Sequence, residues 1–236
     1  DLPGTYSLLA TSFDEQIARD FLLFGEPDVT IVVIDATRLE RNLNLALQVI
    51  EITDRVVVCL NLVDEARRKG IVLDAPGLSR ELGVPVVETA ARSGEGLDRL
   101  REVLEEVALG RVAPRPRRMV EEPARLRAPL GDLRERLDGL FSGLPNARWV
   151  ALRLLEGDER IIESIRSGEL GTLARTTGDS DLVPFSALDE WRDQLLTTAR
   201  RWRREIGETH ETMVAAIYRE AARIAAAVVT TRERQD

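Results

Sequence analysis

A short polar motif closes an apolar run in the first half of the chain. The stretch Asn61-Leu62-Val63-Asp64 follows the run 55–60, which reads as a buried strand. A carboxylate at Asp64 can accept both the N1–H and the N2 amino group of guanine, a pair of donors that adenine lacks. An amide at Asn61 can tie neighbouring loops together. Alone the pattern is weak, because Asn and Asp are also common turn residues.

Two further motifs stand before and after it. The chain opens with Asp1-Leu2-Pro3-Gly4, in which Asp1 can hold a Mg²⁺-bound water and Gly4 can bring a backbone N–H against a γ-phosphate. The alternative for this stretch is a plain Pro-Gly turn. After the short strand 85–88 comes Thr89-Ala90-Ala91-Arg92, where a backbone N–H can reach the guanine O6. Three weak signals in this order make a strong one.

The order and spacing of the motifs resemble the third, fourth and fifth motifs of a small GTPase domain. The amino-acid sequence of the stretches 1–8 and 33–43 is similar to the GTPase domain of the ferrous-iron transport protein B (FeoB) family. Neither stretch is expected of GTPases in general. The similarity continues through 27–29, 61–66 and 146–158, covers most of the chain, and thins over 165–205.

This resemblance implies the GTP-binding and GTP-hydrolysing part of a ferrous iron membrane transporter, in which the nucleotide state regulates or drives iron uptake. It implies GTP or GDP and Mg²⁺ as cofactors, K⁺ as a further candidate ion, and Fe(II) as the transported substrate. The implied partners are the guanine nucleotide, the protein's own membrane domain and small Feo accessory proteins. The implied location is the cytoplasmic face of the bacterial inner membrane, with the present chain itself soluble.

Residue roles follow from the family pattern. The implied nucleotide-binding residues are Asp1, Gly4, Asn61, Leu62, Val63, Asp64, Ala90 and Ala91. Asp1 would hold Mg²⁺ through water, Asp64 would contact the guanine edge with support from Asn61, and Ala91 would offer its N–H to O6. Ala90 stands where the family usually has Ser, so guanine affinity is expected to be lower by about 1 kcal/mol. Thr5 stands where Ras-like proteins carry a water-orienting Gln, so slow hydrolysis is expected and no catalytic residue is named.

A phosphate-binding P-loop, G-x-x-x-x-G-K-S/T, does not occur in these residues. In the family that loop precedes the D-x-P-G motif, so we interpret the chain as lacking the N-terminal P-loop part and expect it to bind nucleotide poorly. A naturally degenerate protein is the alternative. The chain also ends about where the family's first membrane segment would be approached, which predicts that the membrane domain is missing as well.

Composition narrows the other possibilities. A net charge of −8 and a pI near 5.0 argue against a nucleic-acid partner. The single cysteine, Cys59, lies in an apolar strand and is expected to be a core residue, and the single histidine, His210, is expected on the surface. No segment approaches the roughly eighteen consecutive apolar residues that span a bilayer.

Periodicity predicts an α/β first half and a helical second half. Together with the resemblance to the FeoB family, this implies an α/β fold with a truncated P-loop GTPase-type parallel sheet and flanking helices, followed by an all-α helical domain. Strands are expected at 29–34, 55–60 and 85–88, and helices at 40–52, 78–82 and 97–107. Residues 1–110 would form the partial GTPase domain. Residues 111–129, rich in Pro and Arg, would be an extended linker, and 130–236 the helical domain leading toward the membrane part.

Two alternatives remain open beside the transporter GTPase. One is a different small GTPase, for example of the ribosome-assembly type. The amino-acid sequence of residues 1–8 and the acidic pI disfavour it. The other is a non-hydrolysing helical interaction module with a degenerate GTPase remnant, which the missing P-loop favours.

Overall fold

The computed structural model of the chain describes residues 2–3, 7–8, 12–25, 27–118, 123–141, 144, 146–170, 185–207 and 209–231. The chain forms two compact units. The first comprises Asp1–Val120 together with Ala215–Asp236, and the second comprises Glu121–Val214.

A parallel sheet forms the centre of the first unit. Its strands are β1 (Thr30–Asp35), β2 (Val56–Asn61) and β4 (Val86–Glu88), in the order β1-β2-β4. Strand β2 is buried from Val56 to Leu60, as expected of a parallel strand covered on both faces. The register places Asp35 beside Asn61, so the carboxyl ends of β1 and β2 meet at one edge.

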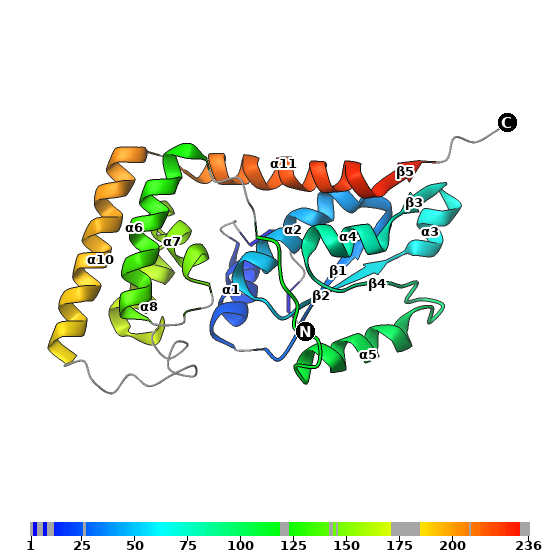
Figure 1. Cartoon of the computed structure of the whole chain (residues 1–236), viewed down its shortest axis with the longest axis horizontal. Helices are drawn as coiled ribbons and strands as arrows, with labels where there is room; N and C mark the ends of the chain where they lie inside the picture. The colour runs from blue at the N-terminus through cyan, green and yellow to red at the C-terminus, as the bar shows by residue number, and fades with distance from the viewer. Residues whose placement is uncertain are drawn as a thin grey trace. The chain divides into compact units, whose positions relative to one another are not determined.

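Helices cover the two faces of this sheet (Figure 1). Helix α5 (Leu97–Ala108) packs Val103 and Val107 against Val57 and Val87 on one face. Helix α2 (Leu39–Ile52) lies on the other face and is buried along most of its length. Because neighbouring residues of a strand point to opposite faces, the aliphatic run of β2 can serve both helices.

Shorter elements complete the first unit. Helix α1 begins after a capping box in which the Ser12 hydroxyl accepts from the Glu15 N–H and the Glu15 carboxylate accepts from Ser12. The Thr37 N–H donates to the Asp35 carboxylate at 2.7 Å, which starts the 3₁₀ turn after β1. The remaining elements are α1 (Phe13–Phe24), η1 (Ala36–Arg38), α3 (Val63–Arg68), β3 (Ile71–Leu73) and α4 (Ala75–Leu82).

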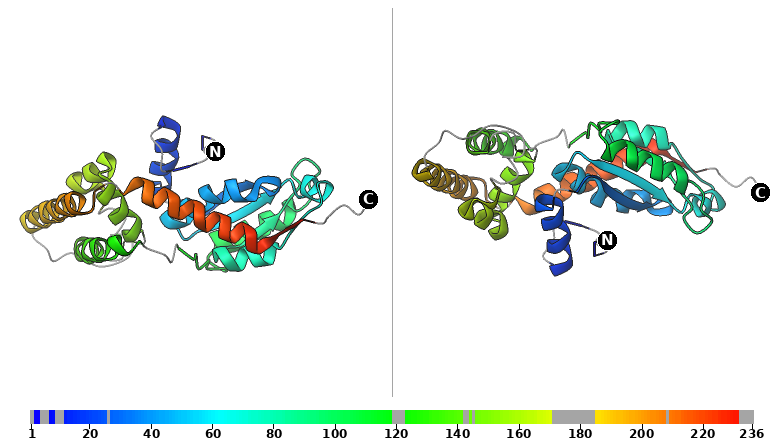
Figure 2. Two further views of the ribbon diagram at one scale, coloured as in Figure 1. Left: turned by 90° about the horizontal axis from the view of Figure 1, so that it is seen from above. Right: turned by 90° about the horizontal axis from the view of Figure 1, so that it is seen from below.

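The C-terminal segment from Ala215 packs with the first unit, although the sequence analysis placed it in the helical domain. Strand β5 (Val229–Thr231) pairs antiparallel with β3, and the second half of α11 (His210–Val228) runs alongside α2 (Figures 1 and 2). Arg223 donates to Glu81 at 2.7 Å. Hydrogen bonds to Glu220 and then to Glu81 raise the pKa of Arg223.

In its described residues the second unit consists of helices and their connections. The helices are α6 (Ala124–Leu140), α7 (Ala147–Glu156), α8 (Glu159–Ser167), α10 (Phe185–Ile206) and the first residues of α11. Helix α6 buries Leu126, Leu130, Leu133 and Leu137, a stripe at helical spacing. The predicted all-α character of this region is therefore present.

The expected linker 111–129 ends earlier than predicted. Helix α6 already begins at Ala124 and contains Pro129, because the buried leucine stripe outweighs the backbone hydrogen bond that proline cannot make. Before it, the Arg115 N–H donates to Gly83 O at 3.0 Å and the Arg117 N–H to Leu82 O at 2.8 Å, so this part is fixed to the first unit. Gly83 is required there, since a Cβ would lie 2.0 Å from Arg115 O.

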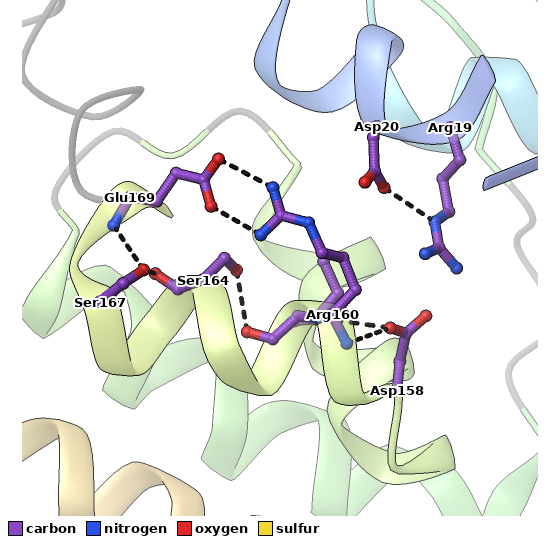
Figure 3. Close-up of polar contacts among 8 residues, drawn as sticks. Arg19, Asp20, Asp158, Arg160, Ser164, Ser167 and Glu169 are labelled. Atoms are coloured by element: carbon purple, nitrogen blue, oxygen red, sulfur yellow. Dashed lines mark hydrogen bonds and ion pairs between the residues drawn. The ribbon is translucent and has the colours of Figure 1, made fainter. Parts of the chain in front are cut away.

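Ion pairs and caps order the second unit locally. The Asp158 carboxylate accepts from the backbone N–H groups of Arg160 and Ile161 and thereby caps α8. The Arg160 guanidinium donates two hydrogen bonds to Glu169, at 2.6 and 2.8 Å (Figure 3). None of the helices in the described part of the chain is long and apolar enough to cross a membrane.

Candidate nucleotide-binding site

The predicted base-binding residues lie at the carboxyl end of the sheet. Asn61 is the last residue of β2, and Thr89 directly follows β4, the strand beside it. Parallel strands present their carboxyl ends at the same edge, which is where open α/β sheets bind ligands. The stretches 61–64 and 89–91, which are far apart in sequence, therefore meet here.

Asn61 ties the two stretches together through its side-chain oxygen. Its Oδ1 accepts from the Thr89 hydroxyl at 3.2 Å and from the Ala91 N–H at 3.1 Å. The N–H that was expected to reach the guanine O6 thus donates to Asn61.

The backbone of Thr89 adds two more bonds between the same stretches. Its N–H donates to Leu60 O at 2.8 Å, and its carbonyl accepts from the Val63 N–H at 3.2 Å. The Thr89 side chain is fully buried. Thr89 therefore fixes the geometry of the site with its N–H, its carbonyl and its hydroxyl.

Leu62 holds an unusual backbone conformation at the turn between β2 and α3. Its φ is 65°, a left-handed value that no other described residue except glycine adopts. For a residue with a side chain this conformation costs about 1–2 kcal/mol, and it persists only where the surroundings fix it. The turn brings Asp64 into the first turn of α3, directly after the strand end.

The Asp64 carboxylate remains accessible at this edge. Its side chain is 41% exposed and its charged partner is Arg68, one helical turn away at 3.4 Å. Arg68 is itself 70% exposed, so this pair is weak and a ligand can compete with it. Two carboxylate oxygens with this exposure can accept two parallel N–H donors.

A compact turn shapes the other side of the site. Ala90 pairs with Glu95 across the turn. Glycine is required at position 96, because its φ is 78° and a Cβ there would lie 2.1 Å from Glu88 O. Arg67 of α3 donates to Glu95 at 2.7 Å, which joins the helix to the turn. This hydrogen bond to Glu95 raises the pKa of Arg67.

Ala90, the position where the family usually has Ser, is buried at 2% exposure and contributes only a methyl group. The nearby hydroxyl of Ser93 donates to Ala90 O at 3.0 Å.

The phosphate side of the predicted site lies largely outside the described residues. This holds for Asp1 and Gly4, and also for Thr5. The stretch after them is anchored, because buried Gln48 of α2 accepts from the Ser7 hydroxyl at 3.1 Å and from the Leu8 N–H at 2.5 Å. Among the described residues, no group of three His, Cys, Asp or Glu side chains is placed to hold a metal ion.

A cavity of about 670 Å³ lies elsewhere in the first unit. It is bordered by η1 and the start of α2 on one side and by Tyr218, Ala222 and Ala225 of α11 on the other. It contains none of the predicted base-binding residues, so the chemistry described above is located at the strand ends and not in this cavity.

Family models match both halves of the chain. The model "Ferrous iron transport protein B" matches residues 1–104, and the model "FeoB cytosolic helical domain" matches residues 123–230. The chain belongs to the FeoB family. The predicted resemblance to FeoB is thereby confirmed.

Curated FeoB relatives are similar over most of this chain. A Porphyromonas gingivalis protein, described as an Fe(2+) transport protein A/Fe(2+) transporter FeoB fusion, is 37% identical over 85% of this chain and 23% of its own length. The Fe(2+) transporter FeoB of Shigella flexneri is 35% identical over 77% of this chain and 24% of its own length. The chain thus spans about a quarter of the length of these FeoB proteins.

Solved FeoB structures share the fold. A mutant of the S. thermophilus NFeoB protein bound to GDP aligns with a TM-score of 0.73 at 28% identity, covering 98% of this chain and 80% of that chain. The cytosolic domain of the T. maritima FeoB iron transporter in a GDP form gives 0.70 at 27% identity, with coverages of 98% and 79%. The predicted fold class, a GTPase-type parallel sheet with flanking helices followed by a helical domain, is confirmed.

Three residues that contribute to the site geometry were not named as site residues from the sequence. Thr89 and Gln48 position neighbouring loops, and Cys59 contacts the Thr89 hydroxyl at 3.2 Å. A polar atom inside an otherwise aliphatic strand was the available signal for Cys59, because such groups need hydrogen-bond partners when buried. Helix α2 contains several polar residues, so no such signal singled out Gln48.

Proposed function

We propose that this chain is the cytosolic guanine-nucleotide-binding part of a ferrous iron transporter. The observation that carries the proposal is the network around Asn61, which fixes the N-x-x-D turn to the turn at 89–91 and leaves the Asp64 carboxylate accessible. Its support from relatives is the GDP bound by the S. thermophilus protein of the same fold.

Base selection in this proposal is performed by Asp64. Guanine presents two donors, N1–H and the N2 amino group, to a carboxylate that accepts both, whereas adenine presents an acceptor at N1. The Ala91 N–H, which the Asn61 Oδ1 holds in place, would donate to the guanine O6. Leu62 and Val63 would shape the first turn of the site, and Ala90 the second through its pairing with Glu95.

The sequence motif D-x-P-G alone supports the phosphate end of the proposed site. Asp1 would hold Mg²⁺ through water and Gly4 would contact the γ-phosphate. GTP hydrolysis is proposed for the complete protein, and slow hydrolysis is expected because Thr5 stands at the position of the water-orienting Gln.

The wider role is proposed from the relatives. Fe(II) would be the transported substrate, and the nucleotide state would regulate or drive its uptake through a membrane domain. The name of the P. gingivalis fusion protein joins transport protein A to the transporter, which supports a small Feo accessory protein as a partner. The proposal places these residues at the cytoplasmic face of the bacterial inner membrane.

The proposal is tested by NMR titration of this chain with GDP, GTP and ADP at millimolar concentration, which detects weak binding. We expect shifts at Asn61, Asp64 and Ala91 with the guanine nucleotides and not with ADP, and we expect Asp64→Ala to abolish the difference.

Asp98→Ala is the matched control for this titration. Asp98 also lies in the first turn of a helix, is 88% exposed and pairs with an arginine, Arg101, at 3.0 Å. If GDP and ADP shift the same residues equally, the guanine site is contradicted. In that case the non-hydrolysing interaction module becomes the better account.

A further inference from the structure

We propose that Cys59, Thr89 and Asn61 form a hydrogen-bond chain of fixed direction, in which the buried Cys59 thiol is a positioning residue for base selection. The proposal rests on the proposed guanine site and adds a residue that does not touch the nucleotide. It concerns how the Asn61 side chain is held in the orientation that the site needs.

Each of the three side chains lies at hydrogen-bonding distance from the next, with Thr89 between Cys59 and Asn61. The Cys59 Sγ lies 3.2 Å from the Thr89 Oγ1, and that oxygen lies 3.2 Å from the Asn61 Oδ1. Cys59 is 5% exposed and Thr89 is fully buried, so water does not substitute for either contact. Between Val56 and Leu60, Cys59 is the one residue of β2 with a polar atom in its side chain.

The Ala91 backbone determines the direction of this chain. Its N–H can only donate, so the Asn61 atom that it contacts at 3.1 Å must be the amide oxygen. The Thr89 hydroxyl contacts the same oxygen and must therefore donate its single proton to it. Because that proton is used, the contact between Thr89 and Cys59 requires the thiol to donate. The order of donation is thus Cys59 to Thr89 to Asn61.

This direction has a consequence for the site. A flipped Asn61 amide would place its NH₂ group against the Ala91 N–H and the Thr89 hydroxyl proton, and two donors repel. The thiol proton occupies the acceptor side of the Thr89 oxygen and keeps the hydroxyl proton pointing at Asn61. Hydrogen bonds in such a chain also polarise one another. Cys59 therefore acts on base selection through Thr89, from the buried end.

The test compares variants that keep or remove each donor. Cys59→Ser keeps an O–H donor and Cys59→Ala removes it; Thr89→Ser keeps the hydroxyl and Thr89→Val removes it at similar shape. Three quantities are measured on the whole chain: the hydrogen-exchange rate of the Ala91 amide, the ratio of ADP to GDP dissociation constants, and the thermal midpoint.

We expect Thr89→Val to lower the ADP-to-GDP ratio by about tenfold and Cys59→Ala by about threefold, since a thiol is the weaker donor. Both should speed Ala91 exchange. Cys59→Ser and Thr89→Ser should keep the ratio within about twofold of wild type, whatever their thermal midpoints. A merely structural role would instead make the ratio follow the thermal midpoint and not the presence of a donor.

The outcomes separate this proposal from the proposed function. If the wild type prefers GDP and Cys59→Ala keeps both that preference and the Ala91 exchange rate, the positioning role is overturned while the guanine site stands. If the wild type shows no preference for GDP, the proposed function fails and the role in base selection falls with it. Ala91 exchange in Cys59→Ala then decides whether the chain of donors exists at all.

Discussion

The strand ends of the first unit and the interior of the helical unit hold their carboxylates differently. At the carboxyl end of the sheet, Asn61 and Thr89 bond to neighbouring loops, and Asp64 keeps an exposed carboxylate with one weak partner. In the helical unit, polar groups bond to one another. Asp132 accepts from Trp202 at 2.8 Å and from Arg136 at 2.7 Å, and the buried Arg153 and Glu156 form an ion pair at 2.5 Å.

This difference shows where to look for ligand chemistry. An accessible carboxylate on a fixed backbone can exchange its weak partner for a ligand, whereas a carboxylate that already accepts several hydrogen bonds gains little from a new one. We therefore expect substitutions at the strand ends to change nucleotide selectivity, and substitutions in the helical unit to change stability.

The largest stability effect is expected from Leu133→Ala. Leu133 is fully buried in α6 within the leucine stripe, and truncation of such a residue leaves a cavity that costs about 2–5 kcal/mol. Chemical denaturation followed by circular dichroism measures the loss, with the adjacent exposed Arg134→Ala as control. A change in guanine selectivity under conditions where the variant stays folded would break the proposed separation of the two units.

A smaller effect is expected at Leu62, where the strain of the site is located. Leu62→Gly relieves the left-handed conformation at φ 65°, so we expect the free energy of unfolding to rise by up to about 1 kcal/mol. Leu62→Val, with a branched Cβ, should lower it by about 1–2 kcal/mol. Urea denaturation of the pair measures the contrast. Equal stability of the two variants would show that the turn is not strained.

The smallest effect concerns the pH dependence of the helical unit. Burial alone would raise the pKa of Asp132. The hydrogen bonds from Trp202 and Arg136 lower this pKa by more than burial raises it, so it lies below the ordinary value. The stabilisation is complete above the ordinary aspartate pKa of about 3.9 and is lost as pH falls through the lower folded value.

This loss of stability at low pH should be absent in Asp132→Asn. The free energy of unfolding of wild type and variant is measured by denaturation at about pH 5.5 and about pH 3, and the losses of the two proteins between these pH values are compared. If both proteins lose the same stability between these pH values, Asp132 is not the group responsible.

The elements that the sequence predicted well have strong periodic patterns. Strands β1, β2 and β4 and helices α2 and α5 lie within a few residues of the expected ranges, because apolar runs and helical stripes reflect burial directly. Helix α3 has only six residues and starts from a left-handed Leu62, which no periodicity reveals. The pairing of β3 with β5 joins residues more than a hundred positions apart, so local pattern could not predict it.

Part of the candidate site could be predicted in the same way. The motif at 61–64 and the turn at 89–91 were identified by residue type, and parallel strand order explains why they meet. The sequence could not show that Asn61 Oδ1 receives two donors, nor that Thr89 bonds through its backbone and its side chain, since both depend on atomic distances across the strands. Pro129 led to a wrong prediction. It suggested a linker, whereas a buried leucine stripe keeps this segment helical.

The most direct test of the central claim is a change of base preference in Asp64→Asn. A carboxylate accepts two hydrogen bonds and so matches guanine, whereas an amide accepts one and donates one and so matches xanthine, which has a carbonyl at C2. Calorimetric or NMR titration with GDP and with xanthosine diphosphate should show a preference for GDP in the wild type and for xanthosine diphosphate in the variant. Retention of GDP preference by the variant would contradict base recognition by Asp64.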